Sequence, residues 1–192
     1  MIITAYAEKQ LRKMARKDVE RLLNAVEKYE ETGQGDVKKS QGREGGRLRV
    51  GTMRALFTIE NDVIVFKAGY RKDIYERWEP MITINHEVLK DGRVAMSSDD
   101  FEDLMDALMF DEAKSNAGEY YPADFAKKLL LSDENRIRLF REYRGLTQKQ
   151  LADSVGISQN AISDIEKGKK EGSTKTLKGI ALALDISLDD LI

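Results

Sequence analysis

The chain has 192 residues, of which 34% are charged and 41% are hydrophobic, a balance typical of globular domains in water. It contains no cysteine and one histidine, His86, which excludes disulfide scaffolds, thiolate metal sites and catalysis by paired imidazoles. No apolar run reaches the roughly 18 residues of a membrane span, and the chain does not open on a signal-peptide pattern. We therefore expect a cytoplasmic protein that uses neither a metal nor a cofactor.

The charges are distributed unevenly along the chain. Residues 1–80 carry 17 Lys and Arg against 13 Asp and Glu, whereas residues 81–132 carry 5 against 11 and residues 133–192 carry 10 against 10. This unevenness predicts three segments with different roles. A basic segment followed by an acidic one suggests that the second covers the first.

The first segment has the pattern of a small α+β domain. Apolar residues recur at three- and four-residue steps over residues 8–31, which predicts a helical stretch divided by Asp18 as an N-cap. Glycines then predict a loop, at Gly42, Gly45 and Gly46. After the loop the apolar period changes to that of antiparallel strands, over residues 47–50, 54–59 and 63–70, with a further short strand expected at residues 2–5.

Four arginines fall on or beside these strands. Arg47 and Arg49 are two residues apart on one strand and so point to the same face, Arg54 lies on the next strand, and Arg71 follows the third. Their convergence predicts an anion site that suits a polymeric phosphate; the alternative is that they only solvate one face of the sheet. Without a usable histidine, Tyr75 is the candidate base for removing a 2′-hydroxyl proton, and an arginine would stabilise the pentacoordinate phosphate.

Residues 1–77 resemble the RelE/ParE toxin superfamily. The resemblance rests on motifs at residues 35–39, 47–51, 54 and 69–75. It implies an α-α-β-β-β toxin domain over residues 1–79, and in members similar to RelE it implies mRNA cleavage on the ribosome by the four arginines and Tyr75. Members similar to ParE share the fold and inhibit DNA gyrase instead.

The middle segment, residues 80–132, is predicted to contain a β-hairpin over residues 82–96, a helix beginning at Ser97 or Ser98, and a linker over residues 114–122. It resembles the Phd-like dimerisation unit of antitoxins. That resemblance implies a neutralising helix with one apolar and one acidic face, whose candidate residues are Phe101, Asp103, Leu104, Asp106 and Leu108. The helix would cover the toxin of its own chain or of a dimer mate; alternatively, its acidic face is only a solvated surface.

The last segment, residues 133–192, carries a helix-turn-helix pattern. Thr147 and Gln150 form a capping box at the start of one helix, which ends at Gly156. Ser158 is a second N-cap, and the helix it opens is predicted to run through Lys167. Two short helices joined by a glycine-centred turn are typical of DNA-binding domains, although a bundle used for protein docking is an alternative.

This segment resembles the Xre/Cro–cI repressor family over about 57 residues, from Arg136 to Leu191. The resemblance implies five helices, the third of which lies in the major groove of DNA. It places four residues against base edges, namely Gln159, Asn160, Ser163 and Asp164. Four others would contact phosphates, namely Gln148, Lys167, Lys169 and Lys170.

Taken together, the three resemblances predict a toxin–antitoxin fusion in one chain, a homodimer that represses its own operon at an inverted-repeat operator. Met81 marks the point where a separate antitoxin would begin, in a natural or an engineered fusion. The alternative is a helix-turn-helix regulator whose ParE-like half is inactive or acts on gyrase.

Overall fold

The computed structural model describes residues 1–40, 44–75 and 98–191. The chain divides into two compact units, Met1–Ala126 and Lys127–Ile192. Of the predicted middle segment, residues 98–126 fall into the first unit and residues 127–132 into the second. The predicted hairpin over residues 82–96, with Met81 and His86, lies outside the described residues. None of the helices in the described ranges combines the length and hydropathy that a membrane crossing requires.

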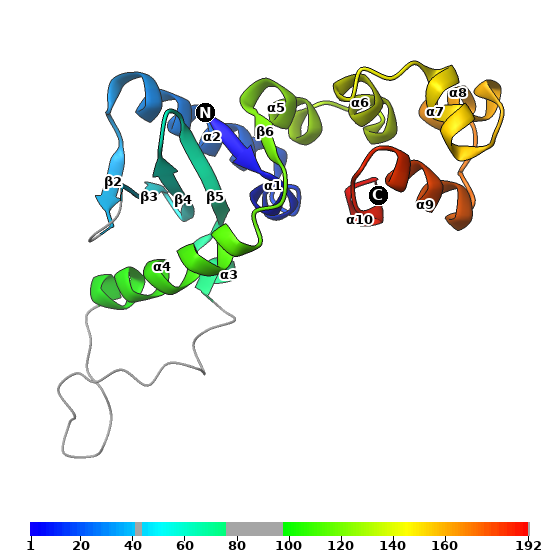
Figure 1. Cartoon of the computed structure of the whole chain (residues 1–192). Helices are drawn as coiled ribbons and strands as arrows, with labels where there is room; N and C mark the ends of the chain where they lie inside the picture. Colours follow the sequence, from blue (N-terminus) through cyan, green and yellow to red (C-terminus); the bar gives the residue numbers. More distant parts are fainter. Residues whose placement is uncertain (41–43, 76–97, 192) are drawn as a thin grey trace, which may run out of the picture. The chain divides into compact units, whose positions relative to one another are not determined.

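The first unit is built on a mixed sheet whose described part has six strands in the order β2-β3-β4-β5-β1-β6 (Figure 1). β1 (Ile2–Thr4) runs parallel to β5 (Val63–Tyr70), and the other neighbouring strands are antiparallel. The remaining strands are β2 (Asp36–Lys39), β3 (Gly45–Val50), β4 (Met53–Ile59) and β6 (Tyr120–Pro122). The predicted strands at residues 2–5, 47–50, 54–59 and 63–70 are therefore confirmed to within two residues.

Two helices follow β1, α1 (Ala5–Leu11) and α2 (Arg16–Thr32). The prediction of two helices is confirmed, but Asp18 is not the N-cap: that position is Ala15, and Asp18 lies in the first turn of α2. Its carboxylate accepts a hydrogen bond from the Tyr70 hydroxyl at 2.6 Å. Acidic residues are favoured both at the N-cap and in the first turn, so the residue type alone does not distinguish the two positions.

The glycine-rich stretch that was predicted to be a loop contains strand residues. Gly45 and Gly46 open β3, where a Cβ atom on Gly45 would lie 2.2 Å from the Phe57 carbonyl oxygen. A Cβ atom on Gly46 would lie 2.3 Å from the Lys38 carbonyl oxygen. These glycines thus allow β3 to approach its two neighbouring strands closely. In the sequence, glycines with this role cannot be distinguished from glycines of a loop.

Residues 120–122 lie in the predicted linker but form strand β6, which pairs with β1 at the edge of the sheet. Ala117 and Glu119 also accept hydrogen bonds from the backbone of Tyr6 and Ala5, at 3.1 and 2.7 Å. Three residues that include Pro122 give little strand signal, and an edge position tolerates a proline. The segment after residue 114 is therefore part of the first unit's sheet.

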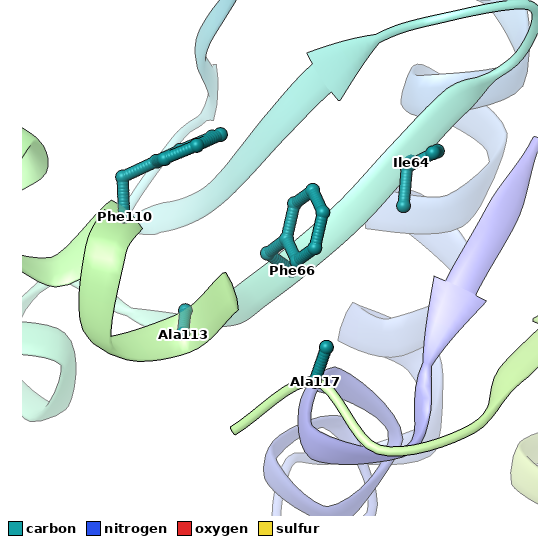
Figure 2. Close-up of a cluster of buried hydrophobic side chains, with 5 residues drawn as sticks. All are labelled: Ile64, Phe66, Phe110, Ala113 and Ala117. Atoms are coloured by element: carbon teal, nitrogen blue, oxygen red, sulfur yellow. The ribbon is translucent and has the colours of Figure 1, made fainter. Parts of the chain in front are cut away.

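Helices pack on both faces of this sheet. Tyr29 of α2 contacts Phe57 of β4 with ring centroids 5.1 Å apart, while α4 (Ser98–Ser115) covers the opposite face. Figure 2 shows part of the α4 contact, in which Phe110 and Ala113 lie against β5. The cluster contains Ile64, Phe66, Phe110, Ala113 and Ala117. The short helix α3 (Arg71–Tyr75) follows β5 directly.

The second unit is helical throughout its described residues. α5 (Ala123–Leu131) crosses the division between the units, and five helices follow, as predicted: α6 (Arg136–Tyr143), α7 (Gln148–Val155), α8 (Gln159–Glu166), α9 (Thr174–Ala183) and α10 (Leu188–Leu191). Their core is formed by buried apolar side chains, among them Phe140, Leu151, Ile162, Ile180 and Leu184.

The predicted caps of α7 and α8 are confirmed. Thr147 and Gln150 form a capping box, and Gly156 ends α7 in the left-handed conformation with φ 72°. The Ser158 hydroxyl accepts a hydrogen bond from the amide of Ala161. Glycine has no Cβ atom and adopts this φ without steric cost, so Gly156 allows the sharp turn between the two helices.

Candidate functional site

The first candidate site is the outer face of α8. Gln159 and Asn160 occupy the first turn of the helix and are exposed, and Ser163, one turn further, is half-buried. Primary amide side chains both donate and accept hydrogen bonds, which lets them pair with the edge of an adenine in the major groove. The helix thus offers to solvent the residue types that base recognition requires.

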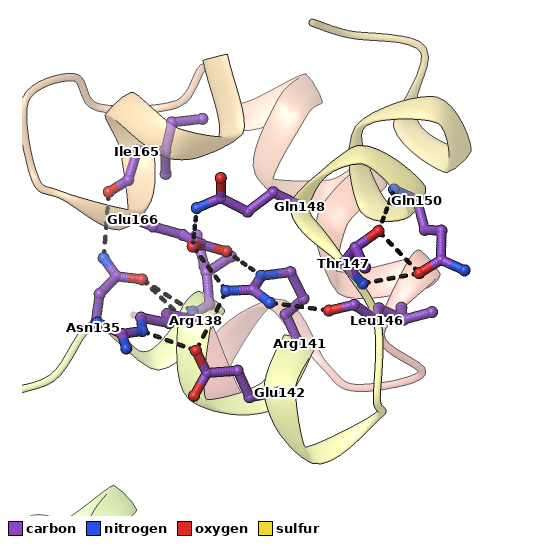
Figure 3. A network of polar contacts seen from close by, with 11 residues as sticks. Asn135, Arg138, Arg141, Glu142, Leu146, Thr147, Gln148, Gln150, Ile165 and Glu166 are labelled. Atoms are coloured by element: carbon purple, nitrogen blue, oxygen red, sulfur yellow. Dashed lines mark hydrogen bonds and ion pairs between the residues drawn. The ribbon is translucent and has the colours of Figure 1, made fainter. Parts of the chain in front are cut away.

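A buried ion pair holds α8 against α6 (Figure 3). Arg141 donates two hydrogen bonds to the Glu166 carboxylate, from Nε at 2.6 Å and from Nη2 at 3.0 Å, and a third from Nη1 to the Leu146 carbonyl. The hydrogen bonds to Glu166 raise the pKa of Arg141. Asn135, the N-cap of α6, also donates to the Ile165 carbonyl at 3.3 Å. These bonds hold the C-terminal end of α8 against α6.

Three of the predicted DNA-contacting residues are engaged within the unit. Gln148 donates to Glu166 at 2.9 Å, and Lys170 forms an ion pair with Asp164 at 2.8 Å. The hydrogen bond from Lys170 lowers the pKa of Asp164. Lys167 and Lys169 are exposed beside this pair. Because Asp164 neutralises Lys170, the positive charge at this end of α8 is smaller than the three lysines at positions 167, 169 and 170 would give.

The second candidate site lies on the face of the first unit's sheet that α4 covers. Arg49 of β3 pairs in register with Arg54 of β4, and Arg47 pairs with Lys38 of β2. Arg71 begins α3 immediately after β5. The sheet therefore brings the four predicted arginines together, as the sequence predicted, and adds one lysine at their edge.

Carboxylates of α4 fill the space between these cations. Glu102 is central: its Oε1 lies 2.7 Å from Arg71 Nε, and its Oε2 lies 3.1 Å from Arg47 Nη1 and 3.3 Å from Arg49 Nη2. The side chain of Glu102 is only 4% exposed, and that of Arg47 only 1%. Charges buried to this degree require paired partners.

Two further carboxylates complete the contact. Asp106 Oδ2 lies 2.6 Å from Arg47 Nη1, and Asp103 lies 2.6 Å from Lys38 Nζ and 3.6 Å from Arg47 Nη2. Of the described side chains named here, five are cations and three are carboxylates. We call this set the arginine cluster, and it consists of Lys38, Arg47, Arg49, Arg54 and Arg71 with Glu102, Asp103 and Asp106.

The apolar contact of α4 agrees in part with the apolar face predicted from the sequence, which comprises Phe101, Leu104, Met105, Leu108 and Met109. Met105 and Met109 are buried and pack with Leu56 and Ile74, and Phe101 packs against that group. Leu104 is only half-buried, and Leu108 is 43% exposed, so it does not belong to this contact. α4 contains both acidic and apolar residues, so more than one of its faces could pack against the sheet. The ion pairs with the arginines favour the face that carries Glu102.

Glu102, Met105 and Met109 lie on the faces predicted for this helix but are not among the predicted neutralising residues, and Lys38 is not among the predicted site residues. Glu102 and Asp106 are four positions apart and share a helix face, which was a usable signal in the sequence. Tyr75 ends α3, but its side chain lies outside the described part of the chain. Among the described residues, no three His, Asp or Glu side chains are placed to hold a metal ion together.

Comparison with known proteins places the second unit. The family HTH_3, helix-turn-helix, matches residues 137–191. The HTH-type transcriptional regulator YazB of Bacillus subtilis is 39% identical over 56 residues, which are 29% of this chain and 81% of that protein. The immunity repressor protein of Bacillus phage phi105 is 37% identical over 57 residues, 30% of this chain and 40% of that protein.

Among solved structures, the chain is similar to SinR, the master regulator for biofilm formation, in complex with DNA. The identity is 28%, the match covers 30% of this chain and 92% of that one, and the TM-score is 0.29. The family match and the coverage of YazB rest on the sequence of the second unit. Through residues 137–191, the chain belongs to the helix-turn-helix family.

Proposed function

We propose that the chain is a DNA-binding transcription regulator of the repressor type. The observation that carries this proposal is the exposed turn of Gln159 and Asn160 on a helix held by the buried pair of Arg141 and Glu166. The names of the relatives, HTH-type transcriptional regulators and an immunity repressor, support it.

In the proposed complex, α8 lies in the major groove of operator DNA. Gln159 and Asn160 read adenines, and Ser163 contacts a neighbouring base or phosphate. Lys167 and Lys169 contact the backbone, with Gln148 at the start of α7. One module of this size reads only a half-site, so a homodimer on an inverted repeat is expected.

Selection of bound sequences from random duplex DNA, using the intact chain, tests this proposal. We expect the selected pool to converge on two inverted half-sites whose centres are separated by about one helical turn, roughly 10 base pairs. A pool that stays random after repeated rounds would contradict sequence-specific binding.

A second function is favoured by the arginine cluster: the first unit is an mRNA endonuclease similar to RelE that α4 holds inactive. The predicted catalytic arginines and the predicted neutralising helix are in direct contact, through ion pairs as short as 2.6 Å. In this proposal the chain is a toxin–antitoxin fusion, and α4 covers the toxin within the same chain. Inhibition of DNA gyrase is the alternative activity of the same unit.

The arginine cluster has the chemistry that this reaction needs. Arginines hold a phosphodiester and stabilise the charge of a pentacoordinate phosphate. Tyr75, in its phenolate form, would take the proton of the 2′-hydroxyl, which attacks the adjacent phosphorus. The bond from phosphorus to the 5′-oxygen of the next nucleotide breaks, and that oxygen takes the proton back from the Tyr75 phenol. Arg71, 49% exposed and four residues before Tyr75, is the cluster member nearest to solvent.

Charge reversal on α4 in the intact chain tests the second function. We expect Asp103→Lys with Asp106→Lys to arrest growth of the host cell and to cleave mRNA on ribosomes, because both changes repel Arg47. Adding Arg71→Ala or Tyr75→Phe should abolish the cleavage. Asp111→Lys, at an exposed position of the same helix, is the matched control and should be harmless. Growth arrest with intact mRNA and inhibited gyrase would favour the alternative.

A further inference from the structure

We propose that Glu102 is a phosphate mimic, whose carboxylate occupies the place that a backbone phosphate of single-stranded RNA takes when α4 leaves the sheet. This inference rests on the second proposed function, because it concerns the regulation of the same site. It goes further because it assigns the inhibition of RNA binding mainly to one residue, whereas the sequence predicted five other residues of α4 for this role.

The contacts of Glu102 are those of a bound oxyanion. Its two oxygens face different arginines, Oε1 towards Arg71 and Oε2 towards Arg47 and Arg49. Arg54 Nε lies 3.8 Å from Oε2. A phosphodiester likewise offers two charged oxygens that arginine side chains bind from several directions.

The position of Arg54 indicates that the site fits a carboxylate imperfectly. Its side chain is 8% exposed, and Nη1 donates to the carbonyl oxygens of Gly51 and Met53 at 2.8 and 2.9 Å. Within the described residues, however, Nε has no hydrogen-bond acceptor. A buried donor without an acceptor is unfavourable. A tetrahedral phosphate extends further than a planar carboxylate and can reach this donor.

The charges of the arginine cluster point the same way. Among the described residues, the cluster as defined contains five cations and three carboxylates. Asp103 forms ion pairs with Lys38 and Arg47, and Asp106 forms one with Arg47. Glu102 lies within 3.8 Å of all four arginines. A strand of RNA carries one negative charge for each phosphate, so several phosphates can compete with the three carboxylates of α4 for these cations.

The test measures binding of a fluorescent single-stranded RNA of ten nucleotides to the intact chain by anisotropy, at low and moderate salt. We expect Glu102→Gln, which keeps the size of the side chain, to raise the affinity by about tenfold or more. Glu102→Lys should raise the affinity for RNA further, because a cation at this position repels the four arginines and releases α4. Asp111→Asn removes one charge from an exposed part of α4 and should change the affinity little.

A double variant tests whether the gain in RNA affinity arises at the arginine cluster. Because the helix-turn-helix unit is identical in all variants, its background binding cancels in the comparison. Glu102→Gln with Arg71→Gln should lose the gain, and the half-exposed Arg71 can be changed without opening the core. If neither Glu102→Gln nor Glu102→Lys binds RNA more tightly than the unchanged chain, the mimic is overturned.

The outcome also separates this inference from the proposed nuclease. Tighter RNA binding without cleavage would retain Glu102 as a phosphate mimic and remove the endonuclease function. Cleavage in the Asp103 and Asp106 variant, with no gain in RNA binding on changing Glu102, would retain the endonuclease and overturn the mimic.

Discussion

Asp106 Oδ2 lies 2.6 Å from Arg47 Nη1, and these two residues are 59 positions apart in the chain. Arg47 is on a strand inside the sheet, and Asp106 is on the helix that covers it. Both side chains are almost fully buried. The pair therefore fixes α4 on the face of the sheet where the arginines lie, and it makes the exposure of those arginines depend on the docking of one helix.

The docking of α4 should depend on Met105 and not on Leu108. Met105→Ala removes a fully buried side chain and should lower the free energy of unfolding of the first unit by about 2–5 kcal/mol, as measured by urea denaturation. Leu108→Ala, at a position 43% exposed, is the control and should change it by less than about 0.5 kcal/mol. Equal effects of the two substitutions would contradict the docking geometry.

Breaking the ion pair between α6 and α8 should destabilise the second unit. Arg141→Met leaves the Glu166 carboxylate buried without its main partner, at a cost of about 3–5 kcal/mol. Arg141→Met with Glu166→Met should recover much of that loss, because the uncompensated charge is removed as well. Thermal unfolding of each variant measures the effect. A double variant less stable than the single one would show that the pair is not the source.

Asp164→Asn should strengthen binding to DNA of any sequence. The substitution releases Lys170 from its ion pair and removes a negative charge from the edge of α8. We expect tighter binding to operator and random DNA alike, and a salt slope steeper by about one counterion. The salt dependence of the dissociation constant measures it. If only operator binding changes, Asp164 reads a base.

The same pair makes a prediction about pH. The hydrogen bond from Lys170 lowers the pKa of Asp164 in the folded protein. Its contribution to folding stability is therefore complete above the pKa that Asp164 has in the unfolded chain, and it is lost as the pH falls through the pKa of the folded state. NMR titration of the Asp164 carboxyl carbon should show a midpoint below that of ordinary aspartates. In Lys170→Met, we expect the midpoint to move upward; an unchanged midpoint would contradict the pairing.

Local signals in the sequence predicted the helices of the second unit, because caps at Thr147, Gly156 and Ser158 act within a few residues. The convergence of Arg47, Arg49, Arg54 and Arg71 was also predictable from strand alternation. Contacts between residues far apart in the sequence could not be predicted in this way. Whether Glu102 or Leu108 turns inward is decided by arginines some fifty residues earlier, and β6 is a strand only because β1 offers it an edge.

The most direct test of the central claim compares the selected operator with random DNA, using the intact chain and Gln159→Ala with Asn160→Ala. The structure places both side chains in solvent, so the double variant should fold normally. We expect it to lose discrimination by about 1–3 kcal/mol for each base contact, while binding to random DNA is retained. Lys169→Ala, the matched control, should weaken both and lower the salt slope. Undiminished discrimination in the double variant would show that α8 does not read the operator.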